Sequence, residues 1–319
     1  MSLKSTTDNL PLASATILLA IFGMSVGDAI IKAIGSNQTF GLWQLFAVRS
    51  AMILPVLAVI ALFWGGAGVV IPKVFRWVAL RGLLMAALWL AYYTALPHLP
   101  LSAAAASLYT LPLFITLFSA IFTDDKVTPI HGLAGLLGFA GAALVLRPGT
   151  DAFNAYALLP LTGAILFGLA MTLTRVKCQE EHPLALAFGL HAVFAGVGLI
   201  GLVVVTMLPG TPLPANLALG WTTLDAQGWG IMAILAISLF VASLGTAIAY
   251  QRAPIAVVGN FEFVYVGLAA LWGFLFFSEN LDLISAAGMI MIAAAGIWSA
   301  RASATSKDGR NSAPEPAKP

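Results

Sequence analysis

A serine motif lies inside the first long apolar run of the sequence. Residues 23–32 read GMSVGDAIIK and open with the G-x-S-x-G pattern of serine hydrolases. A serine nucleophile needs a strand–turn–helix context and a histidine base, whereas this run has the character of one continuous helix. Gly23 and Gly27, four residues apart, also fit the small-xxx-small pattern of packed membrane helices. The stretch therefore predicts a close-packed helix, and an intramembrane hydrolase using Ser25 remains a rival hypothesis.

Three charged residues in apolar surroundings are the next candidates for chemistry. Asp28 and Lys32 are four residues apart, so they share one face of a helix and are able to pair. Arg49 lies in the following apolar run. Charges inside hydrocarbon are costly and usually face a cavity or one another. This cluster is either an outer gate or a site for a charged substrate group, or it only holds two helices together.

A fourth charge, Glu262, lies deep in a late apolar run, with Asn260 and Tyr265 close by on the chain. A carboxyl withdrawn from water is able to take up and release a proton, or to bind an ammonium group of a substrate. We therefore take Glu262 as the proton-coupling candidate. The competing interpretation is a protonated carboxyl that only hydrogen-bonds a neighbouring helix.

Aromatic side chains with polar tips accompany these charges. Trp89, Tyr92 and Tyr93 lie in the third apolar run and Tyr109 lies in the fourth. Such side chains stack against flat or amphipathic solutes and hydrogen-bond them through their tips. We include them, with Tyr265, among the candidate substrate-binding or gating residues, although core packing or lipid contact is an equally simple role.

The composition sets the environment in which these residues act. The 319 residues are 60% hydrophobic and 9% charged, with a mean hydropathy of +0.97, whereas soluble proteins carry about 25% charged residues. The chain is therefore expected to be embedded in lipid. A net charge of +2 without a basic run argues against nucleic-acid binding. One cysteine, scattered histidines and no phosphate-binding loop predict no disulfide, metal site or cofactor.

Ten apolar segments are long enough to span a bilayer, which predicts an all-α integral membrane protein. They are residues 11–33, 41–63, 74–96, 101–122, 129–147, 155–176, 184–207, 229–250, 254–277 and 281–300. Polar tails flank them at 1–10 and 301–319, the second expected to be disordered. With the N-terminus in the cytoplasm, every Lys and Arg except Lys32, Arg49 and Arg147 falls on the cytoplasmic side. Both termini are therefore expected to be cytoplasmic.

The two halves of the chain, 11–149 and 150–300, resemble each other. When the fourth and fifth segments are placed on the ninth and tenth, Phe122 meets Phe277 and Asp124 meets Glu279. A unit of five helices used twice must be inserted in opposite orientations, because five is odd. Inverted repeats are typical of secondary transporters, where two similar halves allow alternating access.

These segments also resemble a known family. Residues 99–149 (LPLSAAAASLYTLPLFITLFSAIFTDDKVTPIHGLAGLLGFAGAALVLRPG) and 250–298 resemble the ends of the two EamA-type repeats of the bacterial drug/metabolite transporter superfamily. The resemblance implies ten helices around a central cavity, in two inverted EamA repeats. The pair of acids at Asp124 and Asp125 before Lys126 is a small departure from the family pattern.

Together these features predict a secondary transporter of the bacterial inner membrane for a small organic metabolite, such as an amino acid or another amphipathic compound. Export by alternating access, with proton coupling, is the first hypothesis. Uptake of a vitamin or nucleotide-like compound is the alternative, and a passive channel or a non-transporting scaffold are rivals from other classes. The expected partners are the solute and the bilayer; the sequence leaves the oligomeric state open, and a monomer is compatible with it.

Overall fold

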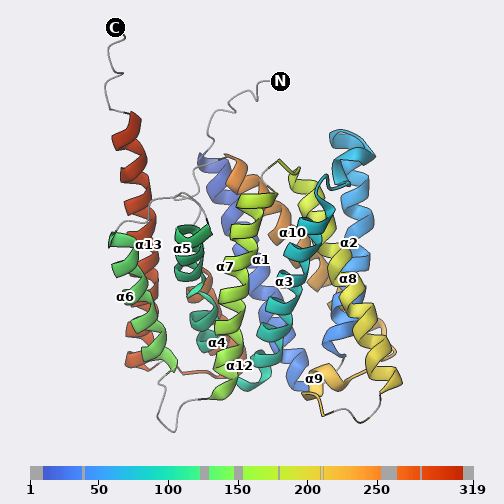
Figure 1. The fold of residues 1–319 in the computed structure, drawn as a ribbon. Coiled ribbons are helices and arrows are strands. Elements are labelled where there is room, and N and C mark those ends of the chain that lie inside the picture. Colours follow the sequence, from blue (N-terminus) through green and yellow to red (C-terminus); the bar gives the residue numbers. More distant parts are fainter. Residues whose placement is uncertain are drawn as a thin grey trace.

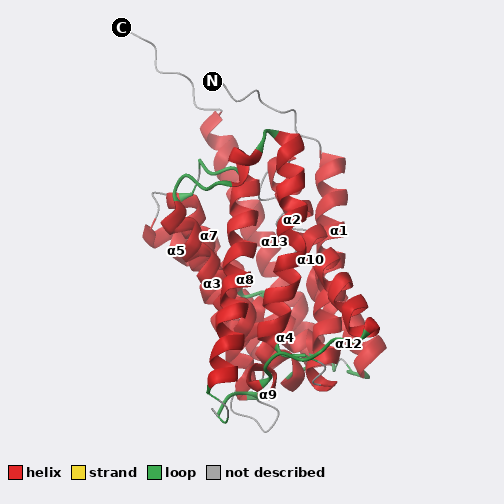
Figure 2. Cartoon of the chain, turned by 90° about the vertical axis from the view of Figure 1, so that its right-hand side faces the viewer, coloured by secondary structure: helices red, strands yellow, loops and turns green. Residues whose placement is uncertain are grey.

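The computed structural model describes residues 10–37, 40–122, 129–146, 154–178, 180–208, 210, 212–252, 264–280 and 282–311. Within these ranges the regular structure is helical and contains no strand (Figure 2). The α-helices are α1 (Leu10–Asn37), α2 (Leu42–Trp64), α3 (Phe75–Ala95), α4 (Leu101–Leu108), α5 (Leu111–Phe122), α6 (Pro129–Leu146), α7 (Leu158–Lys177), α8 (Pro183–Met207), α9 (Ala215–Ala218), α10 (Ala226–Arg252), α12 (Val264–Phe277) and α13 (Leu283–Asn311). Short 3-10 helices η1 (Ala67–Val70), η2 (Leu96–His98) and η3 (Ala155–Ala157) lie between them.

The surface and the helix lengths are those of a membrane protein. Six helices are long and apolar enough to cross a bilayer, and they belong to α1, α2, α3, α7, α8 and α10. Shorter apolar stretches lie in α6, α12 and α13. Large apolar side chains point outward along the bundle, for example Phe63, Ile200 and Ile290. The expectation of an all-α, multi-pass membrane protein is confirmed at this level.

The structure differs from two of the expected segments, one of which is broken and one of which is longer. The segment 101–122 is two helices, α4 and α5, separated at Tyr109 and Thr110. Pro112 follows this break in the first turn of α5, and a proline has no N–H with which to bond the carbonyl four residues earlier. At the other end of the chain α13 continues to Asn311, through part of the tail expected to be disordered.

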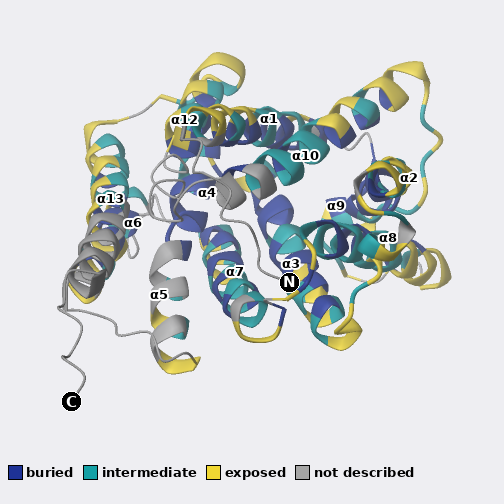
Figure 3. Cartoon of the chain, turned by 90° about the horizontal axis from the view of Figure 1, so that it is seen from above, coloured by how far each residue is buried: buried dark blue, intermediate teal, exposed yellow. Residues whose placement is uncertain are grey.

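Helices from distant parts of the chain pack in pairs. α1 lies against α10, α2 against α8, α3 against α7 and α6 against α13, and Figures 1 and 3 show these neighbours side by side. Gly141 of α6 and Gly288 of α13 are where one pair approaches most closely: a Cβ atom on either would lie 2.6 Å from the other's carbonyl oxygen. Small residues at such crossings let backbones meet in lipid.

The α4 helix occupies the middle of the bundle. It packs against α12, α7 and α6, and most of its residues are buried, as Figure 3 shows from above. Its sequence explains this position, because four consecutive alanines (residues 103–106) give a narrow helix that larger helices are able to surround. The broken segment therefore places its break, and Tyr109 with it, inside the protein rather than at the lipid surface.

Candidate functional site

A hydrogen-bonded group of three side chains joins α1, α3 and α12 in the interior. Asp28 of α1 is 2% exposed and accepts a hydrogen bond from the hydroxyl of Tyr265 in α12. The Tyr265 hydroxyl also lies 3.1 Å from that of Tyr92 in α3. Both tyrosines are fully buried. A carboxyl in such surroundings is stable only when it has partners like these, so this group is the polar centre of the protein.

Aromatic rings surround this polar centre in two stacked pairs. Tyr109, at the break between α4 and α5, stacks on Tyr265 with ring centroids 4.9 Å apart and an angle of 18°. Trp89 stacks on Tyr93 at 5.3 Å and meets Tyr92 edge-on at 5.7 Å. The break after Leu108 is what brings the Tyr109 ring over Tyr265. The rings from α3, α12 and the break between α4 and α5 thus present flat apolar faces with hydroxyl groups among them.

Arg49 adds a positive charge on the α2 side of the centre. Its guanidinium carbon lies 5.7 Å from the Tyr93 ring centroid and 5.8 Å from that of Phe46, and it interacts electrostatically with Asp28. Arg49 is 2% exposed. Its Nε and Nη2 atoms have no hydrogen-bond partner in the described part of the chain. Buried polar atoms normally have partners, so these two atoms are unusual.

His191 of α8 lies beside this charge. It is fully buried, interacts electrostatically with Arg49 and meets the Phe194 ring edge-on at 6.2 Å. Phe194 in turn contacts Phe46 of α2, with ring centroids 4.9 Å apart. Neither ring nitrogen of His191 has a partner among the described residues. Arg49 and His191 are therefore two neighbouring nitrogen-bearing groups among the rings of Phe46, Tyr93 and Phe194.

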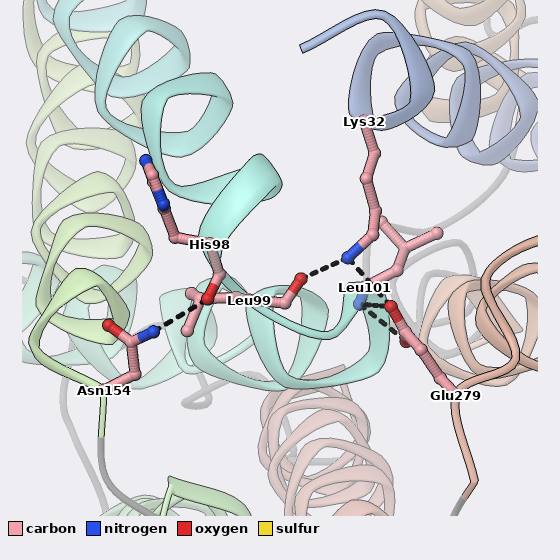
Figure 4. Close-up of polar contacts among 6 residues, drawn as sticks. All are labelled: Lys32, His98, Leu99, Leu101, Asn154 and Glu279. Atoms are coloured by element: carbon pink, nitrogen blue, oxygen red, sulfur yellow. Dashed lines mark hydrogen bonds and ion pairs between the residues drawn. The ribbon is translucent and has the colours of Figure 1, made fainter. Parts of the chain in front are cut away.

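A second polar group lies one helical turn from the centre and ties four segments together (Figure 4). Lys32 of α1 forms an ion pair with Glu279, Nζ to Oε1 2.8 Å, and donates to the carbonyl of Leu99. Glu279 also accepts from the backbone N–H of Leu101, at 2.9 and 2.8 Å. We call these four residues the Lys32–Glu279 layer. Glu279 stands at the N-terminus of α4, where the helix dipole favours a negative charge.

Neighbouring contacts extend this layer across the bundle. Asn154, ahead of α7, donates to the carbonyl of His98, 2.8 Å away, and the His98 ring stacks on Tyr156 at 3.8 Å. Figure 4 shows Asn154 and His98 beside the Lys32–Glu279 layer. The end of α3, the start of α4 and the start of α7 are therefore held together on the same side of the polar centre.

Ser25 has a packing role in this structure. Its hydroxyl donates to the carbonyl of Phe22, 2.8 Å away, and accepts from the indole N–H of Trp272 at 3.0 Å. It lies within α1, and His191 makes no hydrogen bond in the described part of the chain. Gly23 and Gly27 face Ser238 of α10, as the small-xxx-small interpretation predicts. Among the described residues, no histidine hydrogen-bonds Ser25, as a serine nucleophile would require.

The structure thus brings together seven of the candidates identified from the sequence. These are Asp28, Arg49, Trp89, Tyr92, Tyr93, Tyr109 and Tyr265. Lys32 lies apart from them in its own layer, so Asp28 and Lys32 have different partners despite sharing a helix face. Asn260 and Glu262 lie outside the described residues. No metal-binding group of His, Cys, Asp or Glu occurs among the residues searched.

The sequence analysis did not identify two residues that bind candidate side chains, Glu279 and Trp272. Glu279 looked like a polar residue in a loop between two segments, and its pairing with Lys32 depends on how α1 and α12 end in space. A signal existed, because Lys32 is a lone charge that requires a carboxylate. Trp272 looked like part of an apolar run, yet it hydrogen-bonds Ser25.

Comparison with known proteins gives this arrangement a context. Residues 12–147 match the EamA-like transporter family. The Pseudopaline exporter CntI of Pseudomonas aeruginosa is 24% identical over 293 residues, which cover 90% of this chain and 96% of that protein. Riboflavin transporters of Rhizobium johnstonii and Brucella anthropi are 29% and 25% identical, over 71% and 64% of this chain and 69% of each relative.

A solved structure agrees at the level of the fold. One crystal structure, described without a function, matches 95% of this chain and 98% of its own length, with a TM-score of 0.61 and 18% sequence identity. At that identity the likeness shows the fold and nothing more.

Proposed function

Because residues 12–147 match the EamA-like transporter family, we propose that the chain is a secondary transporter that moves a small organic metabolite across the bacterial inner membrane by alternating access. The observation that carries this proposal is the buried bond between Asp28 and Tyr265. It places a polar centre inside an apolar membrane bundle and joins the two halves of the chain. Binding at a midplane between two halves is how such carriers work.

The helix pairing supports an arrangement of ten membrane segments in two inverted repeats. If the five-helix units 11–149 and 150–300 exchange roles, the pair α1–α10 becomes the pair α7–α3, and both are present. The pairs α6–α13 and α2–α8 each map onto themselves, and they are present too. The Leu10 end of α1 and the Asn311 end of α13 point to the same side (Figure 1), as an even number of crossings requires. On this proposal both termini are cytoplasmic.

The interruption at Tyr109 supports a solute site at this level. Carriers with inverted repeats bind their solutes at interrupted helices near the bilayer midplane, where irregular backbone lines the site. Here the interruption faces Tyr265 of the other half. The Tyr109 and Tyr265 rings, with Trp89 and Tyr93, give an amphipathic solute flat surfaces and hydroxyl partners.

The Lys32–Glu279 layer acts in this proposal as the gate on the outer side. It lies between the polar centre and the ends of α1, α4 and α12, and its ion pair is largely withdrawn from water. Opening that side must separate Lys32 from Glu279. The structure would then represent a state closed toward the outside, with Asp28 and Tyr265 buried behind the gate.

The relatives point to two solute classes and two directions. The exporter named above covers almost the whole chain, which favours export of an amphipathic metabolite. The riboflavin transporters favour the alternative, uptake of a vitamin or nucleotide-like compound. Glu262 remains the proposed proton carrier. If Glu262→Gln left transport driven by a pH gradient at its parent rate, this assignment would be abandoned.

Reconstitution separates a carrier from its rivals. Purified full-length protein in liposomes is loaded with unlabelled L-tryptophan or riboflavin, and entry of the labelled compound is followed. A carrier shows saturable entry that the internal solute accelerates. A passive channel shows neither property, and a scaffold gives no entry above empty liposomes. Hydrolase activity is tested separately by labelling of Ser25 with an activity-based serine probe, which the buried hydroxyl is expected to resist.

A further inference from the structure

The guanidinium of Arg49 has one edge without partners. Nε and Nη2 share one edge of the guanidinium, and one N–H bond of each points outward from that edge in parallel. Both lack a hydrogen-bond partner in the described part of the chain, although Arg49 is 2% exposed. An arginine is always charged, and buried N–H donors left without acceptors are strongly unfavourable. The edge is therefore built to meet an acceptor that binds there.

The spacing of these two donors selects the acceptor. Two parallel N–H groups on one guanidinium edge match the two oxygens of a carboxylate, which they bind in a bidentate manner. Both ring nitrogens of the neighbouring His191 are also without partners among the described residues, and one of them is a donor even in the neutral ring. A carboxylate on Arg49 would thus find a further donor beside it.

No described residue hydrogen-bonds Nε or Nη2, although Arg49 does bond the side chain of Tyr93. The carboxylate of Asp28, which interacts electrostatically with Arg49, is held by Tyr265. The groups around the guanidinium are the rings of Phe46 and Tyr93, with Phe194 behind them. Rings exclude water and strengthen a charged hydrogen bond. These rings also select the solute, because the part of it that touches them must be apolar or aromatic.

We propose that the partner-free edge of Arg49, with His191 beside it, is the binding site for a carboxylate of the transported solute. This inference rests on the proposed function in naming the ligand as transported solute, and it narrows the substrate class to organic carboxylates. Charge balance narrows the substrate class further. Arg49 and Asp28 together are neutral, so a zwitterion keeps the buried centre neutral, whereas a pure anion adds an uncompensated charge in low dielectric.

The test compares ligands on the unmodified protein first. Purified full-length protein is titrated by thermal stabilisation with L-phenylalanine, L-phenylalanine amide, 3-phenylpropanoate and inorganic phosphate, and with L-tryptophan against tryptamine. A ligand that binds only the folded state raises its apparent stability. We expect stabilisation by the carboxylates, strongest for the zwitterions, and a loss of about tenfold to a hundredfold in affinity for the amide and for tryptamine.

Variants then locate the effect. Arg49→Lys keeps the charge and removes the planar fork, so carboxylate affinity should fall by about the same factor while the amide is unaffected. Arg81→Lys is the control, because Arg81 is a partly buried arginine whose Nε donates to Thr174, 2.8 Å away. It should leave the ligand preference unchanged. Size-exclusion profiles and melting temperatures establish that each variant is folded.

The outcomes separate this inference from the proposed function. Equal stabilisation by acid and amide, unchanged carboxylate affinity in Arg49→Lys, equal protection by phosphate, or no stabilisation by any carboxylate would each overturn the carboxylate site. Counterflow in liposomes tests transport independently. Counterflow of riboflavin that is insensitive to Arg49→Lys and to added carboxylates would preserve the transporter and overturn the inference. Carboxylate binding without counterflow would preserve the site and remove the transporter.

Discussion

Replacement of Glu279 by glutamine should release the Lys32–Glu279 layer without removing its hydrogen-bonding shape. The amide keeps an oxygen for the N–H of Leu101 but loses the charge that Lys32 faces at 2.8 Å. At an effective dielectric constant of about 20, this separation gives about 6 kcal/mol of gross attraction. Desolvation offsets most of it.

The exposure of the two side chains sets the net value. The side chains of Lys32 and Glu279 are 10% and 15% exposed, so this ion pair is intermediate between a surface pair and a fully buried pair. Surface pairs contribute about 0.2–1 kcal/mol. Breaking a fully buried pair costs about 3–5 kcal/mol. We therefore expect a coupling of about 1–3 kcal/mol, which shifts a two-state equilibrium by about 5-fold to 150-fold. The shift should favour the state that is open on this side.

The assay follows access to a cysteine behind the layer. Ala29 is buried one helical turn inward from Lys32. In a Cys178→Ser background, Ala29→Cys is labelled with a membrane-impermeant maleimide, with and without Glu279→Gln. When the open state is the minor one, the labelling rate follows its population. The rate should rise by the factor given above.

A charge on the same side of the bundle provides the control. Asp225 accepts from the N–H of Gly228 at 2.7 Å and caps α10. Asp225→Asn removes a charge and keeps that bond, so it should not change labelling of Ala29→Cys. If Glu279→Gln labels no faster than its parent, or if Asp225→Asn accelerates labelling equally, the layer is not a gate.

Three further predictions follow from the buried contacts. Tyr265→Phe removes the bond to Asp28 and should lower the initial rate of solute counterflow about tenfold or more, since hydrogen bonds to charged groups contribute about 1.5–3 kcal/mol; an unchanged rate would place the solute elsewhere. Ser25→Ala should keep counterflow within about threefold of the parent, whereas abolished activity with an intact fold would revive the hydrolase. Burial raises the pKa of the Cys178 thiol, so less of the reactive thiolate is present at pH 7 and maleimide labelling of native protein should be slow and rise with pH. Fast labelling at pH 7 that does not depend on pH would contradict that burial.

The sequence analysis identified the charged residues of the polar centre because charged side chains are unusual in apolar segments. A carboxyl such as Asp28, or an arginine such as Arg49, stands out in an apolar run, and hydrocarbon makes such residues rare. Tyr92 and Tyr109 were candidates on another ground, because aromatic rings with polar tips stack against solutes and hydrogen-bond them. Composition and segment length likewise sufficed for the membrane class, since both follow from the thickness of a bilayer.

What the sequence did not specify depends on three-dimensional contacts. Asp28 and Lys32 share a helix face, yet they have different partners. Asp28 is bound by Tyr265 at the start of α12, and Lys32 is bound by Glu279 just after the end of that helix. Spacing within one helix carries no information about such a neighbour. The division of the fourth segment was also missed, because Pro112 is tolerated within many membrane helices and only packing around Tyr109 decides between a bend and a break.

The most direct test of the account is counterflow of a labelled solute into proteoliposomes, with L-tryptophan and riboflavin as probes. The account predicts saturable entry that speeds up when the same unlabelled solute is inside, and that falls in Tyr265→Phe. Entry that neither saturates nor responds to internal solute, or that is no greater than in empty liposomes for both probes, would contradict a carrier built around the Asp28–Tyr265 centre.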